Sequence, residues 1–427
     1  MGQANSLESP NPRIPKPPNP RTPEPSNPMR ILQLCKKFPF PLKEGEAIAV
    51  YFLSRGLVEQ GCTVDLLAMN TSKHFYAPTE WPAEFSHYTE INAVKVDNNL
   101  TTIGAFQNLF SRESYHVSRF DTPEFATALT EALERNNYDA ILLETLYLAP
   151  YIPLIRSKSK AAVVMRSHNV EFAIWERIIA NTAPGLKRRY LRHLTHKLRR
   201  FEIAQLQAYD LLATVSAHDL AEFKRLGYKG YHLVAPIGLD LDRYPVQEPE
   251  VQQPLSLGFI GSLDWMPNRE ALEWFIQKVW PLLRRHFPEL VFEIAGRNAP
   301  AHFLKNKVPG IKFTGEVPDA ATFIAKHPIS LAPMRSGSGI KVKVLEAMAL
   351  ERVVLGTTIA LEGIPAQDGK EFFLANTPEE YVQQLLGLRE NPHLARKLGK
   401  AARALVKREF DYRDVAKKLL AGIERLD

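Results

Sequence analysis

The sequence has little cysteine and no long apolar run. Its 427 residues include two cysteines, Cys35 and Cys62, and neither belongs to a CxxC pair. Two cysteines cannot build a disulfide framework, so the composition favours a reducing compartment. No apolar run reaches the roughly 18 residues of a membrane-spanning helix, and the N-terminus lacks the apolar region of a secretory signal. These absences predict a cytoplasmic protein, either free or peripheral on the inner face of the membrane.

Several catalytic motifs are also missing. The sequence contains no GxxxxGK[ST] loop, no HExxH, no GxSxG and no clear DxD. The parts for ATP hydrolysis and metal-dependent hydrolysis are therefore lacking. We expect neither an essential metal nor a cofactor.

What is present is ordinary globular composition with a basic balance. Apolar residues make up 45% of the chain and charged residues 24%, and the formal net charge is +7. This length suits two domains of about 200 residues each. The positive charge fits nucleic acid, an anionic membrane surface or phosphorylated small molecules as partners.

Hydrophobic periodicity divides the chain into two similar halves. Residues 1–28 are rich in Pro, Asn and Ser, which predicts a disordered tail. After Met29, apolar strands alternate with amphipathic helices, as in parallel sheets covered on both faces. We interpret the chain as an N-terminal Rossmann-like domain at 29–240, a linker at 241–254, a C-terminal Rossmann-like domain at 255–408 and a final helix at 409–427. The expected strands are 30–35, 63–69, 138–143, 161–167, 211–215, 255–260, 290–295, 311–313, 329–333, 352–355 and 371–374. The clearest expected helices are 47–59, 122–135, 268–284 and 340–350.

The strongest functional signal is the segment Leu331–Ala349, which reads as a strand, a glycine-rich loop and a helix. Gly337 and Gly339, on either side of Ser338, allow the backbone to approach a ligand closely. The N-terminus of the following helix suits a phosphate through its free N–H groups and its dipole. The segment therefore predicts a phosphate site at the carboxyl edge of the second sheet.

Charged residues surround the same loop. Arg335, Lys341 and Lys343 add positive charge, and Lys343 shares a helix face with Glu346 three residues later. A lysine on phosphate and a carboxylate on ribose hydroxyls would divide the binding of a nucleotide between them. The alternative is a solvated turn with a surface Lys–Glu pair.

Three other polar positions follow predicted strands. Gly261 and Ser262 end one strand just before an amphipathic helix, although a structural turn explains this junction equally well. His168 ends another strand and would face a cleft between the domains, unless it is a structural histidine. Gly45 opens the helix after the first strand and could approach a donor phosphate, although its acidic neighbours oppose this.

The segment 186–200 is a basic amphipathic helix with leucines at 186, 191, 194 and 198. Such a helix can lie on an anionic membrane. The alternative is a core-packed helix with a solvated basic face. Nucleic acid is a poorer fit because few aromatic residues interrupt the basic cluster.

Together these segments resemble the family 4 retaining glycosyltransferases of the GT-B fold, the glycosyl transferases group 1. The resemblance covers nearly everything after Met29. It rests on Arg166–Glu171, Ala213–Ser216, Ala235–Asp240, Phe259–Ser262, Ile294–Gly296 and Gly337–Ala349, in that order. It implies an α/β fold of two doubly wound Rossmann-like domains that face a central cleft, with the C-terminal helix crossing back. It also implies metal-independent transfer of a sugar, with retention, from a nucleotide-sugar held by the C-terminal domain.

The resemblance assigns roles to individual residues. His168 and Lys343 are the expected catalytic residues, because His168 matches a histidine near the transferred sugar and cations stabilise a departing diphosphate. Glu346 matches a glutamate that holds the donor ribose. The expected donor-binding residues are Gly45, Gly261, Ser262, Arg335, Gly337, Ser338, Gly339, Lys341, Lys343 and Glu346. Ser338 is a departure, because eight positions before Glu346 the family often has a glutamate that contacts the sugar.

Three hypotheses follow. The first is a glycosyltransferase that acts on a glycan or lipid-linked glycan acceptor in cell-surface polysaccharide biosynthesis. The second is an isomerase on the same architecture, such as a nucleotide-sugar 2-epimerase. The third is a membrane-surface binding protein with a degenerate donor site, which Ser338 and the basic helix at 186–200 motivate.

Overall fold

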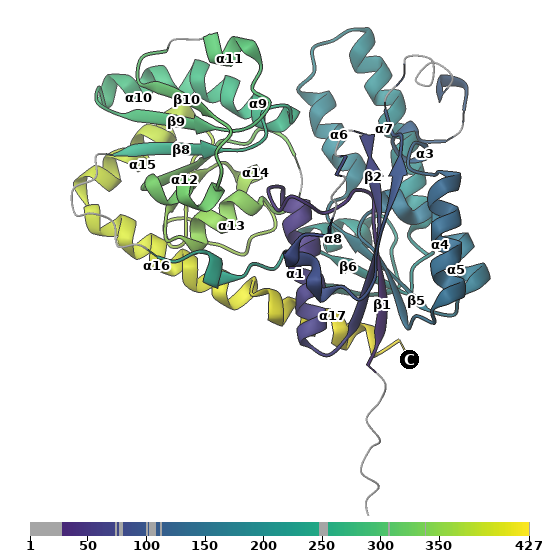
Figure 1. Ribbon diagram of the computed structural model, residues 1–427. Coiled ribbons are helices and arrows are strands. Elements are labelled where there is room, and N and C mark those ends of the chain that lie inside the picture. Colours follow the sequence, from purple (N-terminus) through teal and green to yellow (C-terminus); the bar gives the residue numbers. More distant parts are fainter. Residues whose placement is uncertain are drawn as a thin grey trace, which may run out of the picture.

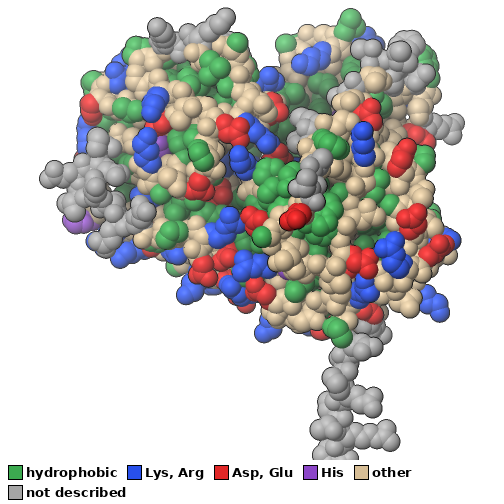
Figure 2. Space-filling view, in the orientation of Figure 1, with side chains coloured by type: hydrophobic (Ala, Val, Ile, Leu, Met, Phe, Trp, Pro, Cys, Tyr) green, Lys and Arg blue, Asp and Glu red, His purple; other side chains and the backbone are tan. Residues whose placement is uncertain are grey.

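The computed structural model describes residues 28–72, 75–76, 80–99, 101, 108–111, 113–246, 255–305, 308–337 and 339–426. In this part of the chain, two parallel β-sheets with helices around them form two lobes (Figure 1). The molecule is hollowed between the lobes at the top of the view in Figure 2. Two α/β domains that face each other were predicted, and this prediction is confirmed.

The first sheet has the strand order β3-β2-β1-β4-β5-β6-β7. Its strands are β1 (Arg30–Cys35), β2 (Thr63–Thr71), β3 (Ile91–Val96), β4 (Ala140–Leu143), β5 (Ala162–Ser167), β6 (Leu211–Thr214) and β7 (Tyr231–Val234). Its helices are α1 (Gly45–Glu59), α3 (Tyr115–Ser118), α4 (Pro123–Arg135), α5 (Ile152–Lys158), α6 (Glu171–Ala180), α7 (Leu186–Gln205) and α8 (Ala217–Arg225). The interior strands β4 and β6 are buried throughout, as apolar runs covered on both faces should be.

The expected strands do not include β3 and β7, which lie at the two edges of this sheet. In β3 only Val96 is buried, and all four residues of β7 are half-buried. An edge strand faces solvent along one side, so it carries no continuous apolar run for sequence patterning to detect.

The second sheet has the order β10-β9-β8-β11-β12-β13. Its strands are β8 (Ser256–Ile260), β9 (Val291–Ala295), β10 (Ile311–Gly315), β11 (Ile329–Ala332), β12 (Val353–Gly356) and β13 (Phe373–Leu374). Its helices are α9 (Met266–Trp274), α10 (Trp280–His286), α11 (Ala301–Lys305), α12 (Ala320–Lys326), α13 (Val342–Ala349), α14 (Thr358–Leu361), α15 (Pro378–Glu390) and α16 (Pro392–Glu409). The helix expected at 268–284 is divided by a π-helical turn at Phe275–Val279. Pro281 has no N–H for a regular helical bond, and a wide turn accommodates that loss.

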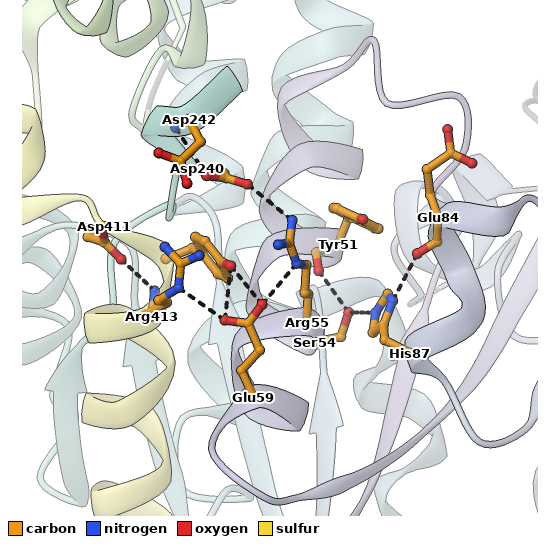
Figure 3. Close-up of polar contacts among 11 residues, drawn as sticks. Tyr51, Ser54, Arg55, Glu59, Glu84, His87, Asp240, Asp242, Asp411 and Arg413 are labelled. Atoms are coloured by element: carbon orange, nitrogen blue, oxygen red, sulfur yellow. Dashed lines mark hydrogen bonds and ion pairs between the residues drawn. The ribbon is translucent and has the colours of Figure 1, made fainter. Parts of the chain in front are cut away.

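The C-terminal helix α17 (Tyr412–Ile423) returns to the first domain and packs on α1. Tyr412 donates its hydroxyl to Glu59 at 2.8 Å, and Arg413 lies 3.1 Å from the same carboxylate. Arg55 joins this group to Asp240, as Figure 3 shows. The predicted crossing back is therefore confirmed.

The part of the predicted linker that the structure describes contains one short 3-10 turn, Leu241–Arg243, and residues 247–254 lie outside the described part. The predicted tail lies outside it as well, except for its last residue. Among the helices that the structure describes, none combines the length and apolarity needed to cross a membrane.

Candidate functional site

The glycine-rich loop follows β11, a central strand of the second sheet, at its carboxyl end. Gly337 and Gly339 have φ angles of +109° and +68°, a conformation that favours glycine. Ser338 between them lies outside the described residues. Arg335 is exposed, and its guanidinium lies 4.8 Å from the centre of the Trp274 ring. The loop therefore lies at the carboxyl edge of the sheet, and the Arg335 guanidinium beside it rests on the Trp274 ring.

Lys343 lies in the first turn of α13 and reaches toward the end of β8. Its Nζ donates to Asn268 Oδ1 at 3.0 Å and lies 4.0 Å from the centre of the Phe259 ring. Burial and, to a smaller extent, the charge of Lys341 lower the pKa of Lys343 to about 7.

Lys341 lies at the N-cap of the same helix, and its Nζ donates to Gly339 O at 2.7 Å. Burial lowers the pKa of Lys341 to about 8, although the carboxylate of Glu362 opposes the shift. Within the described part of the chain, neither Lys341 nor Lys343 forms an ion pair with a carboxylate. Two desolvated amines at a helix N-terminus are suited to bind an anion, because an anion restores the charge that burial disfavours.

Glu346 lies one turn further along α13. Its side chain is buried, and Oε1 accepts a hydrogen bond from the Tyr244 hydroxyl at 3.1 Å. Burial raises the pKa of Glu346 to about 7, although the Tyr244 bond opposes the shift. The arrangement differs from the exposed Lys–Glu pair of the alternative interpretation, because Lys343 and Glu346 have separate partners.

The loop after β8 lies beside Lys343. A Cβ at Gly261 would come within 2.8 Å of Asn268 Nδ2 and 3.3 Å of Lys343 Nζ. Asn268 Nδ2 donates to the main-chain oxygen of Ser262 at 2.8 Å, and Ser262 Oγ accepts from Arg297 at 3.2 Å. The structure thus brings Gly261, Ser262 and Lys343 together around the Asn268 amide.

Gly45 begins α1 and faces the start of α13 across the domain boundary. A Cβ at Gly45 would come within 2.9 Å of Val342 Cγ2. Its neighbour Glu44 pairs with Lys37 and with Arg297 of the second domain. Burial alone would raise the pKa of Glu44, but these cations outweigh it and lower the pKa. The opposition expected from this acidic neighbour is therefore weakened by Lys37 and by Arg297, which is distant in sequence.

His168 follows β5 and is buried. Its Nε2 lies 2.9 Å from Glu144 Oε2, which is also 3.1 Å from Arg166 Nη1. Gln33 donates to the other carboxylate oxygen at 2.6 Å. The main-chain oxygen of His168 meets the glycine-rich loop, because a Cβ at Gly339 would lie 2.6 Å from it. The structure places His168 beside the loop through its backbone, while its ring is held by the first domain.

Several partners of these residues were not among the predicted site residues. Glu144 directly follows the expected strand 138–143, so its place at a strand tip was an available signal. Tyr244 falls in the segment interpreted as a linker. Arg177 and Glu362 carry no local signal, because they meet only through the tertiary structure.

The second domain is similar in sequence to a known protein family. Residues 254–391 match the family model described as glycosyl transferases group 1. The matched segment spans most of the C-terminal domain. It contains the glycine-rich loop, Lys343 and Glu346.

Solved structures of low identity share the whole fold. Sucrose-phosphate synthase from Thermosynechococcus elongatus aligns with a TM-score of 0.72 at 16% identity, over 93% of this chain and 99% of that one. Anabaena HepE, solved in complex with UDP-glucose, aligns with a TM-score of 0.63 at 13% identity, over 93% and 100%. These likenesses identify the two-domain arrangement as the GT-B fold.

A curated relative from Klebsiella pneumoniae is described as an uncharacterized 44.6 kDa protein in the cps region. It is 21% identical over 302 residues, which cover 67% of this chain and 74% of the relative.

Proposed function

We propose that the chain is a retaining glycosyltransferase that moves a sugar from a nucleotide-diphosphate-sugar to a glycan or lipid-linked glycan acceptor. The observation that carries the proposal is the pair of side chains on α13, Lys343 and Glu346. Both lie on the helix that follows the glycine-rich loop, where Lys343 bonds to Asn268 and Glu346 bonds to Tyr244, and the pKa of each is shifted to about 7. A family model of glycosyl transferases and a GT-B neighbour solved with UDP-glucose support a nucleotide-sugar as the donor.

In this proposal the second domain holds the donor. Lys343 and Lys341 contact the diphosphate at the N-terminus of α13, and Glu346 accepts hydrogen bonds from the ribose hydroxyls. The positive charge of the lysines increases when the diphosphate arrives, so they stabilise the leaving group as the glycosidic bond breaks. His168, whose ring is oriented by Glu144, contributes to the site of the transferred sugar from the first domain.

The decisive measurement is calorimetric binding of UDP, GDP and ADP to the purified chain without added metal. We expect one nucleotide to bind, and Glu346→Ala to weaken it at least about tenfold, as the loss of a buried charge-assisted hydrogen bond does. Glu379→Ala, at an exposed position in the first turn of α15, is the matched control. Binding that Glu346→Ala leaves unchanged would refute the ribose assignment.

Metal independence and retention need their own tests. Among the described residues, no group of three or more His, Cys, Asp and Glu could hold a metal ion. Because lysines provide the positive charge in this proposal, we expect full turnover in excess chelator. We also expect the first-formed product to keep the anomeric configuration of the donor by NMR. Loss of turnover that Mg²⁺ or Mn²⁺ restores would contradict the first expectation, and an inverted anomer the second.

Helix α7 motivates the proposal of a peripheral site on an anionic membrane. Leu194 and Leu198 are buried, as in a core-packed helix, but Leu186 is 85% exposed. Four basic side chains at helical spacing line a shallow hollow of about 360 Å³: Arg189, Arg192, His193 and His196. An exposed leucine beside a basic stripe suits a membrane surface, where a lipid-linked acceptor would lie.

Vesicle flotation tests this association. We expect vesicles with phosphatidylglycerol to carry the wild-type chain, and the double variant Arg189→Glu/Arg192→Glu to remain behind. Lys397→Glu/Lys400→Glu changes the same charge on exposed positions of α16 and is the control. Equal flotation of both variants would remove α7 from the proposal.

An isomerase would instead convert the nucleotide-sugar without any acceptor, and NMR of the reaction mixture would detect this conversion.

A further inference from the structure

A cluster of charged side chains joins the two domains beside the glycine-rich loop, outside the residues assigned to the donor. Arg177 of α6 in the first domain donates through Nη2 to Glu362 Oε1 at 2.7 Å, and its Nη1 also pairs with Glu362. Glu362 directly follows α14 of the second domain. His218 of α8 lies 2.6 Å from the same carboxylate, so side chains from two helices of the first domain contact Glu362.

Arg177 also reaches the glycine-rich loop itself. Its Nη1 donates to the main-chain oxygen of Gly337, so one guanidinium holds both Glu362 and the loop. Asn181, at the end of α6, donates to the main-chain oxygen of Arg335 at 3.4 Å. One end of α6 therefore contacts the loop at two carbonyl groups.

Close packing fixes the loop against the first domain as well. A Cβ at Gly339 would lie 2.4 Å from Asn169 Oδ1, so only a glycine allows this approach. Gly363, next to Glu362, has a φ of +86°, and a Cβ there would lie 2.9 Å from Ser216 Cβ. Two loops of the second domain thus rest on the carboxyl edge of the first sheet.

We propose that Arg177 and Glu362 are positioning residues that couple the shape of the donor loop to closure of the two domains. The loop belongs to the second domain, but its carbonyl groups are held by a helix of the first. When the domains separate, Arg177 leaves and the loop loses the contact that fixes Gly337. The transferred sugar is then correctly placed only in the closed enzyme. This rests on the donor site proposed above.

The charge balance supports a specific contact. Burial alone would raise the pKa of Glu362, but Arg177, Lys341 and His218 outweigh burial and lower it. The carboxylate is therefore ionised and 11% exposed at the domain boundary. A planar guanidinium can bind a carboxylate through two parallel bonds, which a lysine cannot reproduce.

The first test measures domain closure without any ligand. Small-angle scattering should give a larger radius of gyration for Arg177→Gln than for wild type. Arg225→Gln removes an exposed pair with Glu222 on the surface of α8 and should scatter like wild type. The proposal fails if Arg177→Gln scatters like wild type.

The second test separates positioning from binding. We expect Arg177→Gln to lower kcat for donor turnover by about tenfold to a hundredfold, as misplacement of a reacting group does. The Kd for the nucleotide should change less than about threefold, because Lys343 and Glu346 remain. Arg177→Lys, which keeps the charge but loses the fork, should give an intermediate kcat.

A double-mutant cycle then tests whether Arg177 and Glu362 act through the same contact. Glu362→Gln should lower kcat similarly, and the double variant should be no worse than the poorer single variant, because both remove one contact. Additive losses would show that the residues act separately and would overturn the coupling. If wild type binds no nucleotide, the proposed function fails, and the scattering comparison alone still decides whether Arg177 and Glu362 hold the two domains together.

Discussion

Gly339 is constrained both by its backbone conformation and by the atoms around it. It combines a φ of +68° with neighbouring atoms that leave no space for a Cβ. Gly369 has a similar φ of +73°, yet nothing lies within 4 Å of its Cβ position. Comparing substitutions at these two glycines therefore distinguishes the effect of backbone strain from the effect of a lost contact between the domains.

We expect Gly369→Ala to cost about 1 kcal/mol of stability and to leave kcat unchanged, because only the backbone conformation is disfavoured. Gly339→Ala should lower kcat at least about tenfold, because the methyl group pushes the loop away from Asn169 and His168. Chemical unfolding and steady-state kinetics on both variants measure these effects. Similar kinetics for the two would mean that the Gly339 contact has no role in closure.

The lowered pKa values of Lys343 and Lys341 predict that the protein takes up protons when a diphosphate binds. At pH 8 an amine with a pKa of about 7 is mostly neutral, and one of about 8 is half-charged. A bound diphosphate raises both pKa values, so binding should take up about one proton at pH 8 and much less at pH 6. Glu346, with a pKa of about 7, is mostly ionised at pH 8 and contributes little.

Calorimetry in two buffers of different ionisation enthalpy gives the number of protons taken up. Lys343→Met should remove most of the uptake. Binding without any proton uptake at pH 8 would place the diphosphate away from these amines.

At the scale of elements, the contact between α1 and α17 depends on small residues. A Cβ at Gly56 of α1 would lie 2.6 Å from Ala416 Cβ and 3.0 Å from Tyr412 O. These helices therefore approach so closely that even one methyl group forces them apart. Gly387, inside α15, has nothing within 4 Å of its Cβ position and serves as the matched helix glycine.

We predict that Gly56→Ala lowers the free energy of unfolding by about 2 kcal/mol, as overpacking of a close contact does. Gly387→Ala should instead raise it by about 0.5–1 kcal/mol, because alanine is the better helix former. Urea unfolding of both variants measures the difference. Stabilisation by Gly56→Ala would contradict the close approach of α1 and α17.

At the scale of the whole molecule, α17 completes the first domain although it belongs to the end of the chain. Its buried side chains Tyr412, Val415, Leu419 and Ile423 face the first domain from the C-terminal end. Elsewhere, one buried apolar cluster contains side chains of both domains, including Ile48 and Val342. The two lobes in Figure 1 are thus joined by packing as well as by the connecting chain.

A chain that ends at Phe410 should lose about 6 kcal/mol or more from the first domain, because each large buried side chain contributes about 1.5–3 kcal/mol. That loss approaches the whole stability of a domain, so we expect the first domain to unfold at a much lower temperature in calorimetry. A chain that ends at Ile423 keeps all of α17 and is the control. Equal melting of the two truncated chains would show that α17 does not stabilise the first domain.

The sequence by itself determined the architecture and the local parts of the site. Alternation of apolar strands and amphipathic helices predicted two parallel sheets, because the spacing of apolar residues along a short segment indicates both its secondary structure and its buried face. Glycines and lysines between β11 and α13 marked the candidate phosphate loop for the same reason. The half-exposed edge strands β3 and β7 were not predicted, because their apolar residues form no clear pattern.

Only the tertiary structure decided which groups meet. Arg177 lies 185 positions from Glu362, and Glu44 is neutralised in part by Arg297 of the other domain. The shifted pKa values of Lys343 and Glu346 likewise arise from burial by several elements. These contacts join residues that are far apart in the sequence. Local sequence patterns depend only on neighbouring residues, so they could not predict which distant side chains the folded chain brings together.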